Sequence, residues 1–392
     1  MITVVGLDGS PLSPLALERL AGAALVVGGR RHLGEVPLRE GVPTVALRDD
    51  PEAAVRAVVD AAGDVIVLAS GDPGFFGVLR LLRERVPAAE LEVLPAVSSV
   101  ALAFARAALP WDDALVVSAH GRDLRPAVAA CRAHPKVAVL TAEGAGPAEL
   151  GAALAGLDRR LVVVERAGLE GERVTSAAPS EVAGRDWDPL NVVLVVDDTR
   201  AVAPVKGWVA GREQPAGWAL PEAAFDHRDG MVTKSEVRAL ALARLAPRLG
   251  VQVWDVGAGS GSVAVECARL GAAVVAVEKG DVAHLHANVQ AHEVEVQVVH
   301  GQAPQVLCDL PDPDAAFVGG GGVDVVRAVA ERRPQRVVVA LATLERVAPV
   351  LDALGGYETE AVLLSAQRLQ RLGDGHRLAP TNPVFVVSGV RT

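Results

Sequence analysis

A glycine-rich run flanked by two carboxylates is the part of this sequence best suited to hold a nucleoside cofactor. Asp255 precedes residues 257–261 (GAGSG), and this run follows a hydrophobic strand pattern and opens an expected helix at about Ser262. The glycines permit a tight turn and a close approach of the backbone to a ligand, while the helix N-terminus offers unpaired N–H groups. Glu278 ends the next expected strand, where a carboxylate can accept hydrogen bonds from both ribose hydroxyls of a nucleoside.

The spacing of these glycines separates two classes of cofactor. Dinucleotide-binding proteins carry G-x-G-x-x-G, whereas this run is G-x-G-x-G with an acidic residue two places before the first glycine. We interpret it as an S-adenosylmethionine site. A dinucleotide site and a purely structural turn are the alternatives.

A second set of turns lies in the N-terminal half of the chain. Residues 70–77 (SGDPGFFG) follow a strand pattern and precede a helix pattern, which by itself is also typical of a simple type I turn. Three further segments accompany it, at 25–32 (LVVGGRRH), 94–100 (LPAVSSV) and 118–122 (SAHGR).

The elements that must position these residues alternate between short β-branched runs and Ala/Leu-rich stretches, as in α/β domains with mostly parallel strands. In the first half we expect strands at 2–5, 25–27, 65–69, 114–118, 137–141, 161–165 and 192–196, and helices at 51–62, 75–84, 97–107 and 124–133. In the second half we expect strands at 251–256, 273–277, 294–299, 315–318 and 337–341, then two extended segments at about 357–368 and 383–390.

The alternation stops in one place, which sets the domain prediction. Residues 197–220 carry Pro, Gly and charges without a clear period, as linkers do. We therefore predict a first domain at 1–198, a linker at 199–219 and a second domain at 220–392.

Composition excludes several classes of function. The chain has 392 residues, a formal net charge of −10 and a pI near 5.5, a balance that argues against a nucleic-acid partner. No apolar stretch reaches 18 residues and no basic leader is present, so we expect no membrane span and a cytoplasmic protein. The isolated cysteines, Cys131, Cys267 and Cys308, are expected to be buried thiols, and we expect no metal site among the histidines at 284, 286, 292 and 300.

The two halves each resemble a known module. Residues 220–225, 231–238, 254–262, 300–304, 317–322 and 382–385 resemble, in this order, the C15-methylating and decarboxylating module of the precorrin-6Y methyltransferases of cobalamin biosynthesis. The N-terminal segments resemble the C5-methylating module of the same family, a class III tetrapyrrole methylase of two α/β lobes. The resemblance implies a class III fold over about 1–196, followed by a class I Rossmann-like methyltransferase fold.

This resemblance also implies which residues hold S-adenosylmethionine, one molecule in each domain. In the first domain they would be Gly71, Asp72, Pro73, Phe76, Ser98 and Ser99. In the second domain they would be Thr233, Gly257, Ala258, Gly259, Ser260, Gly261, Glu278, Gln302 and Ala303. Two departures from the family pattern are a shortened first loop at 6–10 and Gln302, which stands where the family usually has Asp.

A corrin precursor carries many carboxylates, so an acidic protein needs local arginines to bind it. Arg31, Arg122 and Arg377 lie beside turn signals, and we predict that they contact this substrate. The resemblance implies that Gly319 and Gly320 edge the methyl-transfer pocket. Further candidates are Arg30, His32, Arg368, Arg371 and His376. No residue stands out as a catalytic base; Asp8 and His120 are the candidates for moving a proton.

The resemblance implies a bifunctional enzyme that methylates carbons 5 and 15 of precorrin-6Y and decarboxylates its ring C acetate. The partner would be a small corrin precursor, and we expect a homo-oligomer, with hand-over to neighbouring pathway enzymes left open. Two alternatives remain at this point: an RNA methyltransferase, which the C-terminal loop alone would allow, and a non-catalytic scaffold that binds corrin or cofactor.

Overall fold

The computed structural model describes residues 1–47, 50–202, 210–212, 215–228 and 230–392. The chain divides into two compact units, Met1–Arg122 with Lys136–Lys206, and Asp123–Pro135 with Gly207–Thr392. The second therefore includes helix α6 (Arg125–Ala133). The predicted linker at 199–219 lies partly outside the described residues, and its boundaries stay a prediction.

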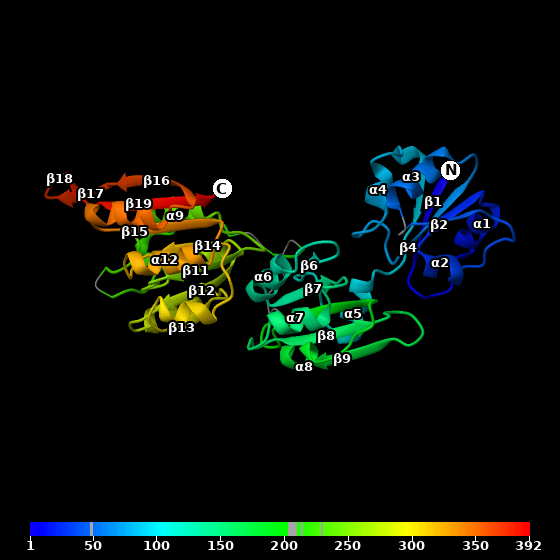
Figure 1. Ribbon diagram of the computed structural model, residues 1–392, viewed down its shortest axis with the longest axis horizontal. Coiled ribbons are helices and arrows are strands. Elements are labelled where there is room, and N and C mark those ends of the chain that lie inside the picture. Colours follow the sequence, from blue (N-terminus) through cyan, green and yellow to red (C-terminus); the bar gives the residue numbers. More distant parts are fainter. Residues whose placement is uncertain (48–49, 203–209, 213–214, 229) are drawn as a thin grey trace. The chain divides into compact units, whose positions relative to one another are not determined.

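Two five-stranded sheets form the first unit (Figure 1). The first sheet is fully parallel, in the order β3-β2-β4-β1-β5, because each strand returns through a helical crossover. Its strands are β1 (Ile2–Leu7), β2 (Leu25–Gly28), β3 (Thr44–Ala46), β4 (Val65–Ser70) and β5 (Leu91–Leu94). The helices between them are α1 (Pro14–Gly22), α2 (Arg30–Glu35), α3 (Pro51–Asp60) and α4 (Leu79–Arg83), with the 3₁₀ turn η1 (Ala88–Glu90).

The second sheet is mixed, in the order β6-β7-β10-β8-β9, with only β6 and β7 parallel. Its strands are β6 (Leu115–Ser118), β7 (Lys136–Leu140), β8 (Arg160–Glu165), β9 (Arg173–Ala177) and β10 (Asn191–Val196). The helices α5 (Ser99–Ala107), α7 (Pro147–Ala153) and α8 (Pro179–Ala183) accompany them. Val100 and Phe104 of α5 are fully buried against Val162 and Leu194 of this sheet, so α5 holds the loop before it in place.

The second unit is built on a seven-stranded sheet in the order β13-β12-β11-β14-β15-β19-β16. The strands are β11 (Gln252–Val256), β12 (Ala273–Glu278), β13 (Gln297–His300), β14 (Ala315–Val318), β15 (Arg336–Leu341), β16 (Tyr357–Leu364) and β19 (Val384–Arg391). The helices are α9 (Ser235–Leu245), α10 (Ser262–Arg269), α11 (Ala283–Ala291), α12 (Val323–Glu331) and α13 (Val347–Ala353), with 3₁₀ turns η2 (Glu222–Ala224), η3 (Gln305–Asp309) and η4 (Leu344–Arg346). Apolar residues pack on both faces of the sheet, as a parallel sheet between helices requires.

Along the chain, β16 is followed by a hairpin of β17 (Gln367–Leu372) and β18 (Gly375–Pro380), and β19 comes after it. Strand β16 ends at Leu364 beside Val384, and β15 ends at Leu341 beside Phe385. Since β15 and β16 both run antiparallel to β19, the hairpin leaves the sheet at its carboxyl edge (Figure 1).

The predicted α/β fold of both halves is confirmed, but some elements differ. The helix expected at 75–84 is only α4, because a Cβ on Gly77 would lie 2.4 Å from the Pro73 carbonyl oxygen and Phe76 has a φ of 53°. The strand expected at 294–299 begins at Gln297, because the Val294 N–H still bonds the Val289 carbonyl at the end of α11. Cys308 is exposed rather than buried, since it lies on the outer side of η3, whereas Cys131 and Cys267 are buried as expected.

Of the described residues, none belongs to a helix with the length and apolar character needed to cross a bilayer. The cytoplasmic location stays a prediction.

Candidate functional site

A cavity of about 530 Å³ in the first unit gathers residues from both sheets. It is lined by Leu7 at the end of β1, Gly71 after β4, Ser118 at the end of β6 and Asn191 at the start of β10. Of the residues predicted for this half, it contains Asp8, Arg31, Gly71, Phe76, Ser99, His120 and Arg122. Residues as far apart in the sequence as Leu7 and Val192 therefore share one site.

Three residues predicted to touch the cofactor do not line this cavity. Asp72 accepts a hydrogen bond from the Gly74 N–H at 2.8 Å, which holds the turn before α4. Ser98 accepts one from the Ala101 N–H at 3.1 Å and so caps α5. Pro73 is buried, and its carbonyl accepts from the Leu79 N–H at 3.3 Å. These three residues hold the turns next to the cavity but do not line it.

Asp8 holds the shortened first loop. Its carboxylate accepts hydrogen bonds from the Ser10 hydroxyl at 2.5 Å, the Ser10 N–H at 3.0 Å and the Val97 N–H at 3.0 Å. Burial raises the pKa of the Asp8 carboxyl, but the bonds from Ser10 and Val97 outweigh it and leave the pKa below its ordinary value. Since a low pKa makes a poor base, His120, which is exposed on the cavity wall, is the better candidate for moving a proton.

Several arginines line the same cavity. Arg31 contacts the Glu35 carboxylate at 3.2 Å and the His32 ring at 2.8 Å, and Arg122 reaches the Ser118 carbonyl at 3.4 Å. Two more arginines that the sequence patterns did not single out, Arg80 on α4 and Arg166 after β8, also line it. The sequence signal that could have identified Arg80 is its basic side chain just after the turn at 70–77.

In the second unit, the glycine-rich loop lies at the carboxyl edge of the sheet between β11 and α10. Gly257 has a φ of 76°, and a Cβ there would lie 2.9 Å from the Gly320 backbone nitrogen. The Gly319 N–H in turn bonds the Val256 carbonyl at 2.9 Å. The predicted cofactor loop and the two predicted substrate glycines are therefore in direct backbone contact.

Glu278 lies at the same edge, at the end of β12. One oxygen of its carboxylate accepts from the Gly259 N–H at 2.8 Å, and the other accepts from the Gly280 N–H at 2.7 Å. Gly259 itself faces open space, with nothing within 4 Å of an added Cβ. An open cradle beside an oriented carboxylate fits a nucleoside whose ribose bonds Glu278.

Asp255, two places before the loop, is fully buried and does not face this cradle. One carboxylate oxygen accepts from the Ala264 N–H at 2.9 Å, and the other has no hydrogen-bond partner among the described residues. Burial raises the pKa of this carboxyl to about 7; the Ala264 bond opposes that rise, and the nearby Glu278 charge adds to it. Its role is to tie the strand to the first turn of α10.

A buried asparagine that the sequence patterns missed fixes the far side of the loop. Asn288 on α11 donates to the Ser260 and Asp226 carbonyls, both at 2.8 Å, and accepts from the Asp226 N–H at 2.6 Å. An Asn inside an amphipathic helix pattern gives no sign of such partners, because they lie 28 and 62 positions away in the sequence.

The remaining cofactor candidates lie close to this edge. Gln302 is exposed and Ala303 half-buried just after β13, where the Gly301 N–H bonds the Glu278 carbonyl at 2.8 Å. Thr233 precedes α9, and its neighbour Val232 packs on Val265 of α10. The Thr233 carbonyl accepts a hydrogen bond from the buried Arg238 guanidinium at 2.5 Å.

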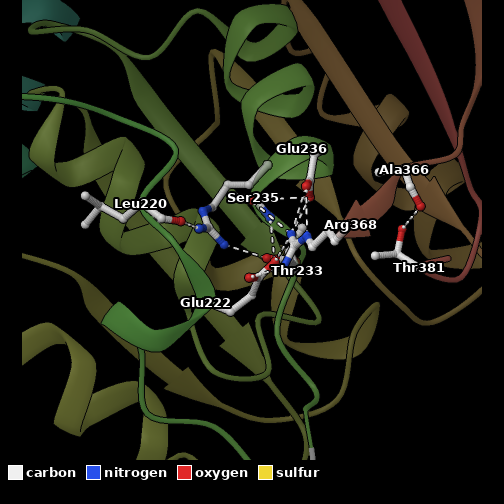
Figure 2. Close-up of polar contacts among 9 residues, drawn as sticks. Leu220, Glu222, Thr233, Ser235, Glu236, Ala366, Arg368 and Thr381 are labelled. Atoms are coloured by element: carbon white, nitrogen blue, oxygen red, sulfur yellow. Dashed lines mark hydrogen bonds and ion pairs between the residues drawn. The ribbon is translucent and has the colours of Figure 1, made fainter. Parts of the chain in front are cut away.

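The cationic residues of the hairpin have different surroundings. Arg368 bonds the carboxylates of Glu222 at 2.8 Å and Glu236 at 2.7 Å, so it fastens β17 to the start of α9 (Figure 2). The hydrogen bonds from Arg368 are the main cause that lowers the pKa of Glu222 to about 2. Arg368 is therefore a structural anchor, whereas Arg377 on β18 is exposed and bonds only the Gln370 side chain among the described residues, at 2.7 Å.

Two of the four histidines considered for a metal site have separate partners. His284 contacts the Asp226 carboxylate at 2.7 Å, and His292 bonds the Ala224 carbonyl at 2.8 Å. Within the described ranges, no three His, Cys, Asp or Glu side chains gather as metal ligands would.

Comparison with known proteins matches each half to a family. Residues 2–183 match the tetrapyrrole (corrin/porphyrin) methylases, and residues 223–391 match the precorrin methyltransferase domain. A precorrin-6Y C(5,15)-methyltransferase [decarboxylating] from Sinorhizobium is 38% identical over 382 residues, which cover 91% of this chain and 88% of that protein.

Two shorter relatives each match about half of the chain. A cobalt-precorrin-7 C(5)-methyltransferase from Salmonella typhimurium is 31% identical over 50% of this chain and 100% of its own length. A probable cobalt-precorrin-6B C(15)-methyltransferase (decarboxylating) from Pyrobaculum calidifontis is 36% identical over 43% of this chain and 94% of its own length.

Proposed function

This chain belongs to the decarboxylating precorrin-6Y C5,15-methyltransferases of cobalamin biosynthesis, and we propose that each of its two units holds one S-adenosylmethionine and performs one of the two methylations. The first unit methylates carbon 5, and the second methylates carbon 15 and removes the ring C acetate carboxyl as carbon dioxide. The division of labour is supported by the two relatives of half length, because one is named for methylation at carbon 5 and the other for methylation at carbon 15 with decarboxylation.

In the second unit, Glu278 and the loop at 257–261 carry the proposal. Glu278 orients the ribose, the loop backbone lies against the rest of the nucleoside, and Thr233, Gln302 and Ala303 complete the walls. Gly319 and Gly320 border the reacting centre, because their backbone contacts Gly257 directly. S-adenosylmethionine supplies an electrophilic methyl group there when bound.

In the first unit, the cavity beside Gly71, Phe76 and Ser99 holds the cofactor, while Asp72, Pro73 and Ser98 fix the turns that form it. Arg31 and Arg122 attract the carboxylates of the corrin precursor. Because the conjugated nitrogens of the acceptor make its ring carbon nucleophilic, the protein mainly positions the reactants and excludes water. His120 takes the proton lost after methylation.

Electron flow in the decarboxylation involves only the acceptor. The electron pair of the broken bond between the acetate CH₂ and its carboxyl carbon passes into the conjugated macrocycle, and a proton from solvent later replaces the lost carboxyl group. The second unit needs only to hold the acetate arm perpendicular to the ring. Arg377 is the proposed contact for a carboxylate on this side.

Mass spectrometry of precorrin-6Y incubated with the protein and methyl-labelled S-adenosylmethionine tests this proposal. The wild type is expected to add two labelled methyl groups and remove one carbon dioxide. Gly259→Arg, which fills the open cradle of the second unit, should leave one methyl addition and no decarboxylation. Asp72→Ala should reduce only the carbon 5 methylation. An unchanged substrate mass with the wild type would refute the proposal.

A further inference from the structure

The cavity of the first unit contains an unbalanced positive charge. Four arginines line it, Arg31, Arg80, Arg122 and Arg166, against the two acids Asp8 and Glu35. This is unexpected on a chain with 48 acidic and 38 basic residues. A concave surface lined by one sign of charge concentrates its field in the cavity and attracts ligands of the opposite sign.

The arginines fall into two pairs according to their partners. Arg31 contacts Glu35 at 3.2 Å, and Arg166 contacts the Asp188 carboxylate at 3.5 Å and the Glu170 carbonyl at 2.9 Å. Asp8 is fully engaged by Ser10 and Val97. No acid that lines the cavity is therefore left for the other two arginines.

Arg80 and Arg122 are exposed, and neither forms an ion pair with any residue that the structure describes. Elsewhere in the same unit, several exposed or half-buried arginines have carboxylate partners. Arg106 bonds Glu172 at 2.5 Å, Arg160 bonds Asp198 at 2.6 Å and Arg173 bonds Glu165 at 2.5 Å. Arg39 and Arg83, which do not line the cavity, bond only the Ala23 and Val86 carbonyls among the described residues, so Arg80 and Arg122 are the arginines of the cavity without acidic partners.

The position of Arg80 is fixed by the turn before α4. The Asp72 carboxylate accepts from Gly74, the Leu79 N–H bonds the Pro73 carbonyl at 3.3 Å, and Gly77 packs so closely that a Cβ would clash with Pro73. Helix α4 accordingly begins at Leu79, after this turn. This places Arg80, its second residue, on the cavity wall beside Phe76.

We propose that Arg80, together with Arg122, determines acceptor specificity in the first unit by binding free carboxylates at the periphery of the tetrapyrrole. This inference rests on the proposed function of that unit and adds a residue to it. A guanidinium forms strong, often bidentate hydrogen bonds with a carboxylate and cannot form them with an ester. The site would thus select acceptors whose side chains are unmodified acids.

Binding of a stable probe tests the proposal without any turnover. Uroporphyrin and its octamethyl ester are titrated into the full chain, and binding is followed by porphyrin fluorescence. Arg80→Gln and Arg122→Gln are each expected to weaken uroporphyrin binding about 10-fold and to leave ester binding unchanged. The matched control is Arg85→Gln, which removes an exposed arginine that pairs with Glu52 at 3.5 Å and does not line the cavity.

Kinetics and cofactor binding identify the source of the bound carboxylate. Arg80→Gln should raise the KM for precorrin-6Y about 10-fold with kcat for carbon 5 methylation within about 2-fold, and Arg80→Lys should recover part of the loss. The affinity for S-adenosylhomocysteine, measured by calorimetry, should not change. A weaker affinity for that nucleoside with an unchanged KM would overturn the proposal, because Arg80 would then bind the methionine carboxylate.

The two proposals fail separately. A chain that binds uroporphyrin through Arg80 but leaves precorrin-6Y unmethylated would refute the proposed function alone. If the chain is active and Arg80→Gln changes neither its KM nor its affinity for uroporphyrin, this inference alone is refuted, since Arg80 would then be a solvated surface charge.

Discussion

Two buried polar side chains, Asp255 and Asn288, support the cofactor loop of the second unit from below. Both are buried: Asp255 bonds the Ala264 N–H in the first turn of α10, and Asn288 bonds the Ser260 carbonyl within the loop. Buried polar groups with such partners are costly to disturb, because the loss of one partner leaves the other without water or protein to bond. The site is therefore sensitive to residues that never touch a ligand.

Asn288→Ala is expected to lower the free energy of unfolding by about 3 kcal/mol, because the Ser260 and Asp226 backbone groups lose a buried partner. It should also weaken S-adenosylhomocysteine binding at the second unit. Thermal unfolding and calorimetry measure both effects. Gln290→Ala, an exposed position on the same helix, is the control and should be neutral. Equal stability of the two variants would contradict this account.

The buried Asp255 carboxyl makes the stability of the fold depend on pH, and the sign of this dependence follows from its raised pKa. Its pKa is about 7 when folded against an ordinary 3.8, so the folded chain keeps a proton that the unfolded chain has lost between those values. This group therefore destabilises the fold progressively from about pH 4 to pH 7, by about 4 kcal/mol at most, and contributes a constant penalty above.

Asp255→Asn removes this penalty. Unfolding of the wild type and of the variant should be compared by denaturant titration at pH 5 and pH 8. The stability difference should shift towards the variant at the higher pH. Asp281→Asn, which changes an exposed carboxylate near the same loop, is the control and should show no such shift. A difference that is independent of pH would contradict burial of a titrating carboxyl.

At the scale of elements, Arg368 is the side chain that ion-pairs the β17–β18 hairpin with the rest of the second unit, among the residues that the structure describes. A two-stranded hairpin is marginal alone, and Leu369 and Leu378 of this one are 73% and 60% exposed. Arg368 joins it to Glu222 and Glu236 at the start of α9 (Figure 2). This network couples the hairpin to the segment that carries Thr233.

Arg368→Met should release the hairpin and destabilise the second unit by about 1 kcal/mol, a modest amount because Arg368 is partly exposed. Hydrogen exchange should become faster at residues 367–380. Arg371→Met, on the same strand and with no ion pair among the described residues, is the control. Since Glu222 has a pKa of about 2, the Arg368 contribution is present above its ordinary value of 4.5 and is lost as the pH falls towards 2. Unchanged exchange in the hairpin would refute its role as an anchor.

At the scale of the whole molecule, the proposal of one cofactor per unit predicts two binding sites in each chain. Calorimetric titration of the wild type with S-adenosylhomocysteine should give a stoichiometry of two. Gly259→Arg should abolish the site of the second unit, and Asp72→Ala should weaken the other site. A wild-type stoichiometry of one would leave a single unit competent to bind. Homo-oligomerisation and hand-over of the product to other enzymes stay predictions.

The sequence by itself determined the fold class of both halves, the glycine-rich loop with Glu278, and the family. It could do so because strand periodicity and loop spacing are local properties that a short window contains. The start of α4 was less predictable, since it depends on how closely Gly77 packs on Pro73.

Only the tertiary structure decided which charges are free to bind. Arg31, Arg80, Arg122, Arg166 and Arg368 are indistinguishable as sequence, yet Arg368 is held by two glutamates while Arg80 and Arg122 face a cavity without acidic partners. The same holds for Asp8 and Asp255, whose pKa values shift in opposite directions. Their partners and their burial come from segments far away in the chain, and only folding brings those segments together.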